Sequence, residues 1–148
     1  MSTLDEYDLP TSAPGVLAPD ALRDPKVRER LSAAAVRLLL KLADEWGLSV
    51  DQRCLLLGDI SRQTYHNWAR GRVGTLSRDQ LERVSLMLGI HKGLKLLFAD
   101  AAAGMRWFRS ANRDVIFAGG SPLDRMLRGS IDDLFAVRRY IDAWRGIK

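Results

Sequence analysis

The chain has 148 residues, of which 47% are hydrophobic and 28% charged, and its formal net charge is +5. This length suits one domain, or two small ones, with enough chain to bury a hydrophobic core. A single cysteine, Cys54, excludes an intrachain disulfide, and with only two histidines no cluster offers the four ligands of a structural zinc site. The positive charge favours a polyanionic partner such as nucleic acid.

The N-terminal segment, residues 1–24, contains three prolines, a glycine and several acidic residues, without an apolar helical period. This composition predicts a flexible or loosely packed arm. The segment has neither the basic start nor the apolar core of a signal peptide. No apolar run in the chain reaches the roughly 18 residues that a membrane helix needs. We therefore expect a soluble, cytoplasmic protein without a membrane partner.

Helix-capping residues divide the next 65 or so positions into four predicted helices. Asp24 followed by Pro25 is typical of a helix start, and apolar residues then recur at helical spacing as far as Trp46, before Gly47. Serines at cap positions predict three further helices, which begin after Ser49, Ser61 and Ser77 and end at Gly58, Gly71 and Gly89.

The remaining chain also predicts helices, and the expected fold class is all-α. Short helices are expected over residues 91–98, 101–109 and 122–127, and a last helix over 131–144. The last helix has an apolar stripe formed by Leu134, Val137, Ile141 and Trp144. The segment 115–117 is the one candidate for a short extended piece, in a region broken by Gly119, Gly120 and Pro122.

The segment from Val50 to Trp68 has the pattern of a helix-turn-helix. Two helices that cross closely need a small residue at the contact, which Cys54 supplies, and a turn glycine, which is Gly58. Ile60 fills the turn, while Tyr65 and Trp68, three positions apart, are expected to dock the second helix on the core. Cys54 is therefore expected to act as a small buried hydrophobic residue rather than as a reactive thiol.

If Tyr65 and Trp68 pack the second helix of the motif on the core, the polar side chains of that helix face the solvent. Arg, Gln and Asn side chains match the edges of guanine and adenine in the major groove. The stretch LLLGDISRQTYHNWARG resembles the helix-turn-helix of the Xre/Cro type, and this resemblance implies that Arg62, Gln63 and Asn67 reach bases. It also implies phosphate contacts from Ser61, Thr64, Arg70 and Arg72, with His66 beside them as a surface residue and not a metal ligand.

Two features depart from a strong DNA-binding motif. Arg53 stands where many such motifs carry an apolar residue, and Asp51 and Asp59 place negative charge near the expected phosphate path. Weak binding by one subunit would make a homodimer on two half-sites of double-stranded DNA more necessary. The alternative interpretation is a solvated polar helix face in a plain helical bundle.

The C-terminal third contains a second motif. Its residues, in order, are Trp107, Phe108, Asn112, Gly119, Gly120, Ser121, Pro122, Leu123, Met126, Leu127 and Gly129, followed by an amphipathic helix. Glycines and a Ser-Pro pair suit a tight turn and a helix start, so a purely structural subdomain also accounts for them. The segment resembles the toxin-binding domain of the MbcA/ParS/Xre antitoxin family.

That resemblance implies a function. Antitoxins of this family neutralise RES-domain toxins, which deplete NAD, by covering the entrance of the toxin's active site, and the complex represses its own operon. On this interpretation the end of the last helix contacts the toxin, through Arg138, Arg139, Tyr140, Trp144, Arg145 and Lys148. Family members often end near a Tyr-Gly pair, whereas this chain ends AWRGIK.

The expected organisation is an arm over residues 1–24, a DNA-binding domain over 25–98 and a toxin-binding domain over 99–148. A stand-alone dimeric regulator, whose C-terminal part dimerises or senses a ligand, is the alternative. An enzyme is not expected, since no nucleophile–base pair, metal cluster or glycine-rich phosphate loop is present in the sequence, and no cofactor is expected.

Overall fold

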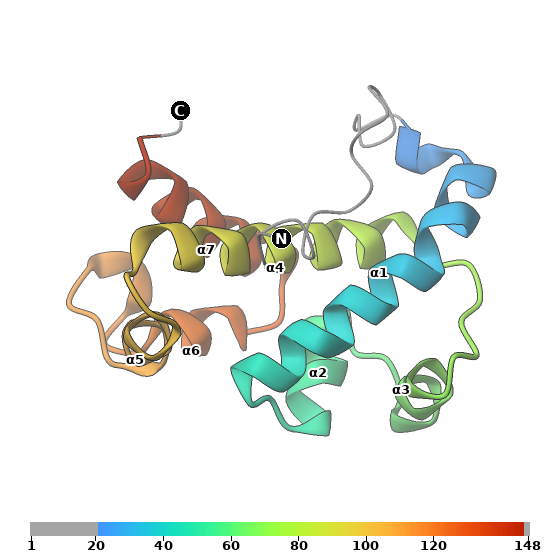
Figure 1. Cartoon of the computed structure of the whole chain (residues 1–148), viewed down its shortest axis with the longest axis horizontal. Helices are drawn as coiled ribbons and strands as arrows, with labels where there is room; N and C mark the ends of the chain where they lie inside the picture. The colour runs from blue at the N-terminus through green and yellow to red at the C-terminus, as the bar shows by residue number, and fades with distance from the viewer. Residues whose placement is uncertain (1–20, 147–148) are drawn as a thin grey trace.

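The computed structural model describes residues 21–146, and within this range the secondary structure is entirely helical, which confirms the expected fold class. No helix in this range is both long and apolar enough to cross a membrane. In chain order the elements are η2 (Ala21–Arg23), α1 (Pro25–Trp46), α2 (Val50–Leu56), α3 (Arg62–Ala69), α4 (Arg78–Leu97), α5 (Ala101–Arg109), η3 (Val115–Phe117), α6 (Pro122–Met126) and α7 (Ile131–Trp144) (Figure 1).

Side-chain caps begin the helices where the sequence predicted them. The Asp24 carboxylate accepts a hydrogen bond from the Lys26 backbone N–H at the start of α1, and Gly47 ends that helix in the left-handed conformation. Four serines form reciprocal capping boxes with the residue three positions later: Ser49, Ser77, Ser121 and Ser130. The boundaries of α2, α3, α5, α6 and α7 therefore follow from local chemistry.

The predicted end of the helix at Gly89 is wrong. The sequence pattern indicated a helix ending at Gly89 and a separate short helix over 91–98, but α4 is continuous from Arg78 to Leu97. Both glycines of its second half lie against α7. A Cβ atom at Gly89 would overlap the Arg138 guanidinium, and one at Gly93 would overlap the Ile141 side chain. These glycines permit a close helix–helix approach and do not terminate the helix.

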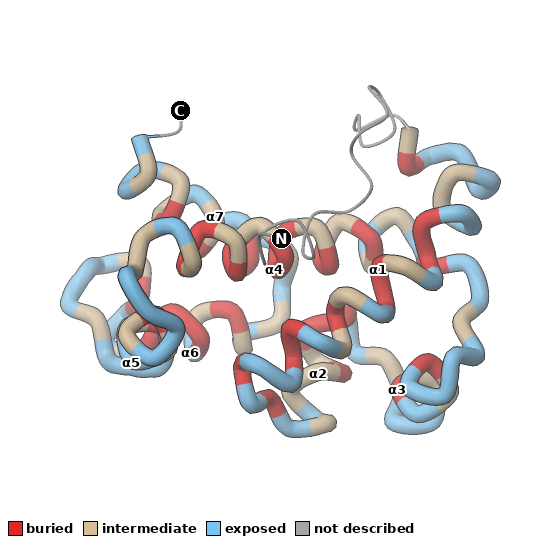
Figure 2. The backbone as a smooth tube through the Cα atoms, in the orientation of Figure 1, coloured by how far each residue is buried: buried red, intermediate tan, exposed pale blue. Residues whose placement is uncertain are grey.

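The long helix α4 joins the two halves of the structure. In the view of Figure 1, α2 and α3 lie beneath one part of it and α5 and α6 beneath the other, while α1 and α7 pack along it. Figure 2 shows buried residues gathered along α4 and its neighbours, whereas much of the outer surface of α3 is exposed. The largest fully buried side chains, among them Trp46, Phe108, Met87 and Leu134, come from both halves.

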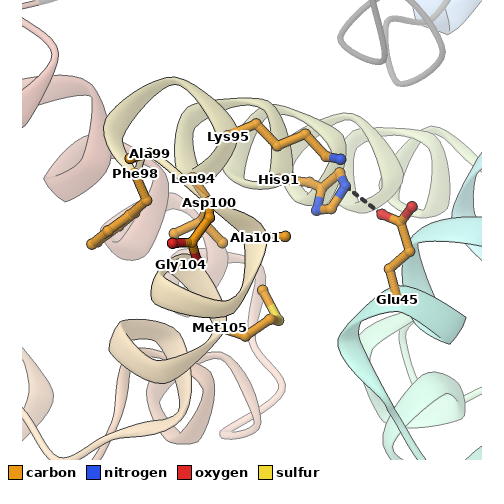
Figure 3. Close-up of a pocket in the computed structure, with 10 residues that line it drawn as sticks. All are labelled: Glu45, His91, Leu94, Lys95, Phe98, Ala99, Asp100, Ala101, Gly104 and Met105. Carbon is orange, nitrogen blue, oxygen red and sulfur yellow. Dashed lines mark ion pairs between the residues drawn. The ribbon is translucent and has the colours of Figure 1, made fainter.

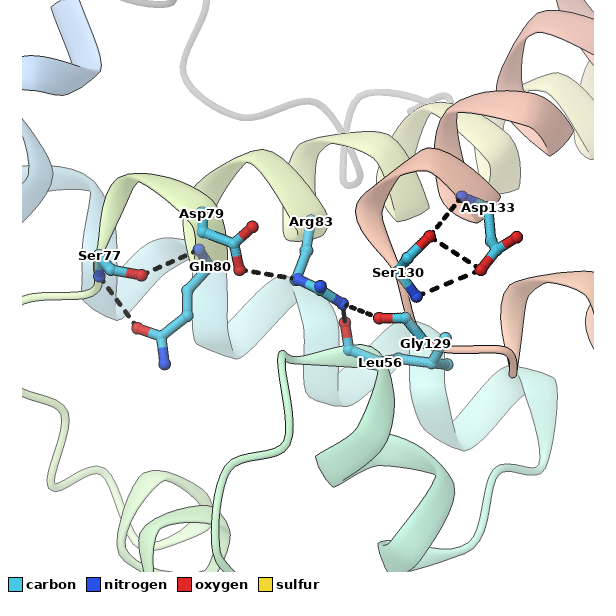
Figure 4. Close-up of polar contacts among 8 residues, drawn as sticks. All are labelled: Leu56, Ser77, Asp79, Gln80, Arg83, Gly129, Ser130 and Asp133. Atoms are coloured by element: carbon cyan, nitrogen blue, oxygen red, sulfur yellow. Dashed lines mark hydrogen bonds and ion pairs between the residues drawn. The ribbon is translucent and has the colours of Figure 1, made fainter.

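Two arginines tie the halves together through backbone carbonyl groups. Arg83 of α4 is buried and donates to the carbonyl oxygens of Leu56, at the end of α2, and Gly129, before α7 (Figure 4). Arg109, the last residue of α5, donates to the Trp46 carbonyl at the end of α1. The contacts bring cationic groups to the negative ends of helices α2 and α1, where they are favourable.

Three further differences concern the predicted ends and loops. The segment 115–117 is a 3-10 turn and not an extended piece, because it is closed by hydrogen bonds from Phe117 and Ala118 back to Asp114 and Val115. Of the apolar stripe predicted on α7, Leu134, Val137 and Ile141 are buried, whereas Trp144, which was also predicted to contact a toxin, is 68% exposed. Of the predicted arm, residues 21–23 form a 3-10 turn with Leu22 buried, and residues 1–20 lie outside the described part of the chain.

Candidate functional site

The helices α2 and α3 form a helix-turn-helix whose buried contacts match the predicted ones. Cys54, Tyr65 and Trp68 are buried, and Ile60 packs against the core from the turn. The turn needs two consecutive residues with positive φ, Gly58 at 90° and Asp59 at 61°. Burial raises the pKa of the Cys54 thiol, which agrees with a packing role rather than a reactive one.

Arg53 departs from the apolar residue common at its position, yet the structure gives it a defined role. Its side chain is 14% exposed, and its Nε donates to the Leu48 carbonyl oxygen at 2.9 Å. The guanidinium also donates to the Tyr65 hydroxyl at 2.8 Å and lies 2.9 Å from the Asp44 carboxylate. Arg53 therefore fixes α3 to the end of α1 through a charged hydrogen-bond network, where a hydrophobic contact was expected.

The polar face of α3 points outward as predicted. Eight residues between Ser61 and Arg72 are proposed to contact DNA. Six of them are exposed on or beside α3: Ser61, Arg62, Gln63, His66, Arg70 and Arg72. The other two, Thr64 and Asn67, are half-buried. The structure thus brings all eight to one end of the molecule. Whether each one contacts a base or a phosphate stays a prediction.

Neighbouring side chains hold part of this face in place. Arg62 pairs with Asp51 of α2, with Nη2 and Oδ1 2.8 Å apart, and both side chains are exposed. The Gln63 amide donates to the Asn67 Oδ1 at 3.1 Å, while the Ser61 hydroxyl caps α3. The amides of Gln63 and Asn67 thus hold each other in place along one side of α3.

In the C-terminal half, the motif residues close a compact turn between α5 and α6. The Asn112 backbone N–H donates to the Gly120 carbonyl at 2.9 Å, and the Asn112 side-chain oxygen accepts from Asp114 N–H at 3.0 Å. A Cβ at Gly120 would crowd Asp124 and the Phe117 carbonyl. Ser121 then caps α6 with Asp124, so these motif positions are explained by the geometry of the turn.

The structure separates the residues that were predicted to contact a toxin. Arg138 and Arg145 are partly buried and both pair with the Asp142 carboxylate. Arg139 is exposed and lies over the Phe135 ring, Tyr140 is half-buried, and Trp144 is exposed. Lys148 lies outside the described residues. The exposed groups of this set are therefore aromatic as much as cationic.

Two protein-family models match this chain. Residues 25–89 match the family described as the antitoxin Xre-like helix-turn-helix domain, and residues 94–146 match the antitoxin Xre/MbcA/ParS C-terminal toxin-binding domain. The chain belongs to the Xre/MbcA/ParS antitoxin family. It is also 40% identical over 113 residues, 76% of this chain and 85% of the relative, to the uncharacterized protein y4oB of Sinorhizobium fredii (strain NBRC 101917 / NGR234).

The two matched segments of this antitoxin meet inside one helix. The first ends at residue 89 and the second begins at residue 94, and both positions lie within the continuous α4. Glycines 89 and 93, where α7 approaches α4 closely, mark this boundary. The helix-turn-helix segment and the segment that matches the toxin-binding domain are therefore connected by a continuous helix and not by a loop.

A cavity of about 430 Å³ at the junction of α1, α4 and α5 was not predicted (Figure 3). Its wall is mainly apolar, with the polar groups of Glu45, His91, Lys95 and Asp100 at its edge. The Trp46 indole N–H donates a hydrogen bond to His91 Nδ1 at 2.8 Å, so the neutral imidazole carries its proton on Nε2. That Nε2 atom lies 2.7 Å from the Glu45 carboxylate. Burial lowers the pKa of His91 to about 4, despite the opposing effect of Glu45.

One feature of the sequence could have predicted the buried contact between His91 and Trp46. His91 falls at helical spacing among the apolar residues Met87, Leu88 and Leu94, and a buried histidine beside a buried tryptophan requires hydrogen-bond partners. Within residues 21–146, no three His, Cys, Asp or Glu side chains gather closely enough to hold a metal ion. The cavity is a polar-edged apolar hollow between the two halves of the antitoxin.

Proposed function

We propose that this antitoxin belongs to a type II toxin–antitoxin pair, neutralises a RES-type NAD-depleting toxin by covering its active site, and binds operator DNA to regulate its own operon. The observation that carries the proposal is the succession of an Xre-like helix-turn-helix match and a toxin-binding-domain match along one chain. The antitoxin acts in the cytoplasm, where both the operator and the NAD pool are found. Its working parts are a DNA-binding domain over residues 25–98 and a toxin-binding domain over 99–148.

The DNA contacts are assigned from the face of α3 that Tyr65 and Trp68 leave exposed. Arg62, Gln63 and Asn67 read base edges, because their paired donors and acceptors suit the major groove. Contacts to phosphates come from Ser61, Thr64, Arg70 and Arg72, which set the position of the protein on the duplex, and His66 lies on the same DNA-facing surface. A homodimer places two such faces on half-sites one helical turn apart.

The DNA part is tested by fluorescence anisotropy with the DNA upstream of the antitoxin gene and with a scrambled duplex. Asn67→Ala and Gln63→Ala should each weaken operator binding by about 1–3 kcal/mol and leave binding to the scrambled duplex nearly unchanged. Arg72→Ala should weaken binding to both duplexes and reduce the salt dependence by about one phosphate contact. Equal binding of the unsubstituted protein to both duplexes would contradict operator recognition.

The toxin part is tested by co-expression with a RES-domain protein encoded beside the antitoxin gene. Growth, cellular NAD and co-purification are measured together. The proposal requires that the toxin alone arrests growth and lowers NAD, and that the antitoxin reverses both within a stable complex. Persistent arrest without a complex would remove the antitoxin assignment.

A stand-alone dimeric regulator that senses a ligand is the second candidate. The cavity between α1, α4 and α5 favours it, because an apolar hollow of this volume with a few polar groups at its edge is typical of a small-molecule site. On this hypothesis the protein binds operator DNA and no RES-domain protein. The co-expression experiment separates the two candidates directly.

A further inference from the structure

Aromatic side chains form a continuous surface on the C-terminal half of the molecule. The Trp107 ring of α5 stacks on the Tyr140 ring of α7, with centroids 6.0 Å apart and planes at 17°, and Trp144 follows with its centroid 6.4 Å from that of Tyr140. Phe117 supports them from the core side, since it is buried and meets the Tyr140 ring edge-on at 5.0 Å. We call Trp107, Tyr140 and Trp144, together with Val115, which follows the Asp114 that bonds to Tyr140, the aromatic surface.

Two members of this surface are unusually exposed for apolar residues. Trp144 is 68% exposed and Val115 is 92% exposed. Single exposed hydrophobic residues are common, but a cluster of them around aromatic rings marks an interaction surface. Trp and Tyr in particular are enriched among the residues that dominate binding energy. The described part of the chain offers no side chain that covers Trp144.

The aromatic surface is held in a fixed shape before any partner binds. The Tyr140 hydroxyl donates a hydrogen bond to the Asp114 carboxylate, and this contact ties α7 to the turn that carries Val115. Burial and the Asp114 hydrogen bond raise the pKa of Tyr140, so the phenol keeps its proton in the neutral range. A preorganised surface loses little conformational entropy on binding.

An exposed cation borders the surface. Arg113 is exposed and precedes Asp114, whose carboxylate accepts the Tyr140 hydrogen bond. By contrast, the Arg139 guanidinium lies over the Phe135 ring, away from Trp144, and Arg138 and Arg145 pair with Asp142 against the glycines of α4. The chemistry that fits the surface is therefore an apolar pocket with a carboxylate at its edge.

We propose that Trp144 is the central anchor of the toxin contact, inserting into an apolar pocket of the toxin while Arg113 meets a carboxylate at its edge. The match of residues 94–146 to a toxin-binding domain selects the toxin as the occupant over other partners. This inference rests on the proposed function and deepens it. It narrows the toxin contact predicted at the end of α7 to the aromatic members Tyr140 and Trp144, and it leaves Arg138 and Arg145 with a structural role.

The test measures the affinity of the full-length antitoxin for the RES-domain protein encoded beside its gene, by calorimetry with a catalytically inactive toxin. Trp144→Ala should weaken the complex by at least about 30-fold, as truncation of a central anchor does. Val115→Glu should weaken it as well, because it places a carboxylate against the apolar pocket. Phe135→Ala is the matched control: it removes an exposed aromatic ring from the opposite flank of α7 and should change affinity less than threefold.

The outcomes separate the inference from the proposed function. Tight binding by the unsubstituted protein with equally tight binding by Trp144→Ala and Val115→Glu would overturn the inference and leave the antitoxin assignment intact. No binding by the unsubstituted protein would overturn both. Conversion of a homodimer to a monomer by Trp144→Ala in sedimentation would assign the surface to a second copy of the chain and also overturn the inference.

Discussion

The Arg83 guanidinium donates to the Gly129 carbonyl oxygen at 2.8 Å and so joins residues 46 positions apart in the sequence. The same Nη1 atom lies 3.3 Å from the Leu56 carbonyl oxygen, and the Nε atom donates to Asp79 at 2.8 Å. Arg83 thereby connects the end of α2, in the DNA-binding half, to the residue before the cap of α7. A Cβ at Gly129 would also meet the Leu55 side chain, which shows how closely the two halves pack there.

Replacing Arg83 by methionine should lower the free energy of unfolding by about 3 kcal/mol, because two carbonyl groups lose a charged donor. Urea denaturation measures the change. Arg78→Met is the control, since Arg78 forms only a partly exposed pair with Glu82 one turn later on the same helix. That pair contributes about 0.5 kcal/mol or less. Equal effects of the two substitutions would exclude a bridging role for Arg83.

The two glycines of α4 should respond differently to alanine. Alanine is a better helix former than glycine by about 1 kcal/mol. At Gly93 the new methyl group meets Ile141, which is fully buried and has no room to move, so Gly93→Ala should destabilise the protein by about 1–3 kcal/mol. At Gly89 it meets the end of the flexible Arg138 side chain, so Gly89→Ala should be close to neutral. Thermal unfolding distinguishes these outcomes, and similar losses in both variants would contradict the packing described.

Stability should fall on acidification because of His91. Its pKa is about 4 in the folded protein, below the usual value of 6.5, since the charged ring is disfavoured by burial. Between these pH values the unfolded chain binds a proton that the folded chain does not, so stability present above pH 6.5 is lost as the pH falls towards 4. A shift of this size corresponds to at most about 3 kcal/mol.

Comparison with His91→Gln isolates this contribution from that of the carboxylates. The variant keeps an acceptor for the Trp46 indole but has no titrating ring, so its stability should change less between pH 6.5 and 4.5. Glu45 and Lys95, which also act on His91, are present in both proteins. Parallel pH profiles for the two proteins would show that His91 does not titrate as described.

The pair formed by Asp51 and Arg62 should restrain DNA binding. Asp51→Asn removes a negative charge from the proposed DNA face and releases Arg62 for a phosphate or a base. Affinity for DNA should therefore rise several-fold at low salt, and the gain should shrink as salt increases. Asp132→Asn makes the same charge change at the exposed start of α7 and should have a smaller effect. Anisotropy titrations at two salt concentrations measure the gains, and equal gains from the two substitutions would contradict this role for Asp51.

Local chemistry made much of the fold predictable. Helix starts were predictable because the capping hydrogen bonds join residues at most three positions apart, so both partners can be read from a short stretch of sequence. These caps are Asp24, followed by Pro25, and the serines at 49, 61, 77, 121 and 130. The outward face of α3 also follows from local spacing once Tyr65 and Trp68 are taken as buried.

The sequence predictions fail where contacts between residues far apart in the sequence determine the local structure. Gly89 has the pattern of a helix end, but its missing side chain makes room for α7, a contact that no local pattern records. Spacing alone does not show whether Trp144, which continues the apolar stripe of α7, is buried or exposed; in the structure it is 68% exposed. Arg53 and Arg83 have hydrogen-bond partners up to 46 residues away in the sequence, so no local pattern predicts the contacts that they make.

The central claim is that this antitoxin neutralises a RES-type toxin, and the most direct measurement is cellular NAD during co-expression with the RES-domain protein encoded beside it. The proposed function predicts that NAD and growth fall when the toxin is expressed alone, and that both recover when the antitoxin is present and co-purifies with it. NAD that stays depleted in the presence of abundant, folded antitoxin, with no complex recovered, would contradict the claim and favour a stand-alone DNA-binding regulator.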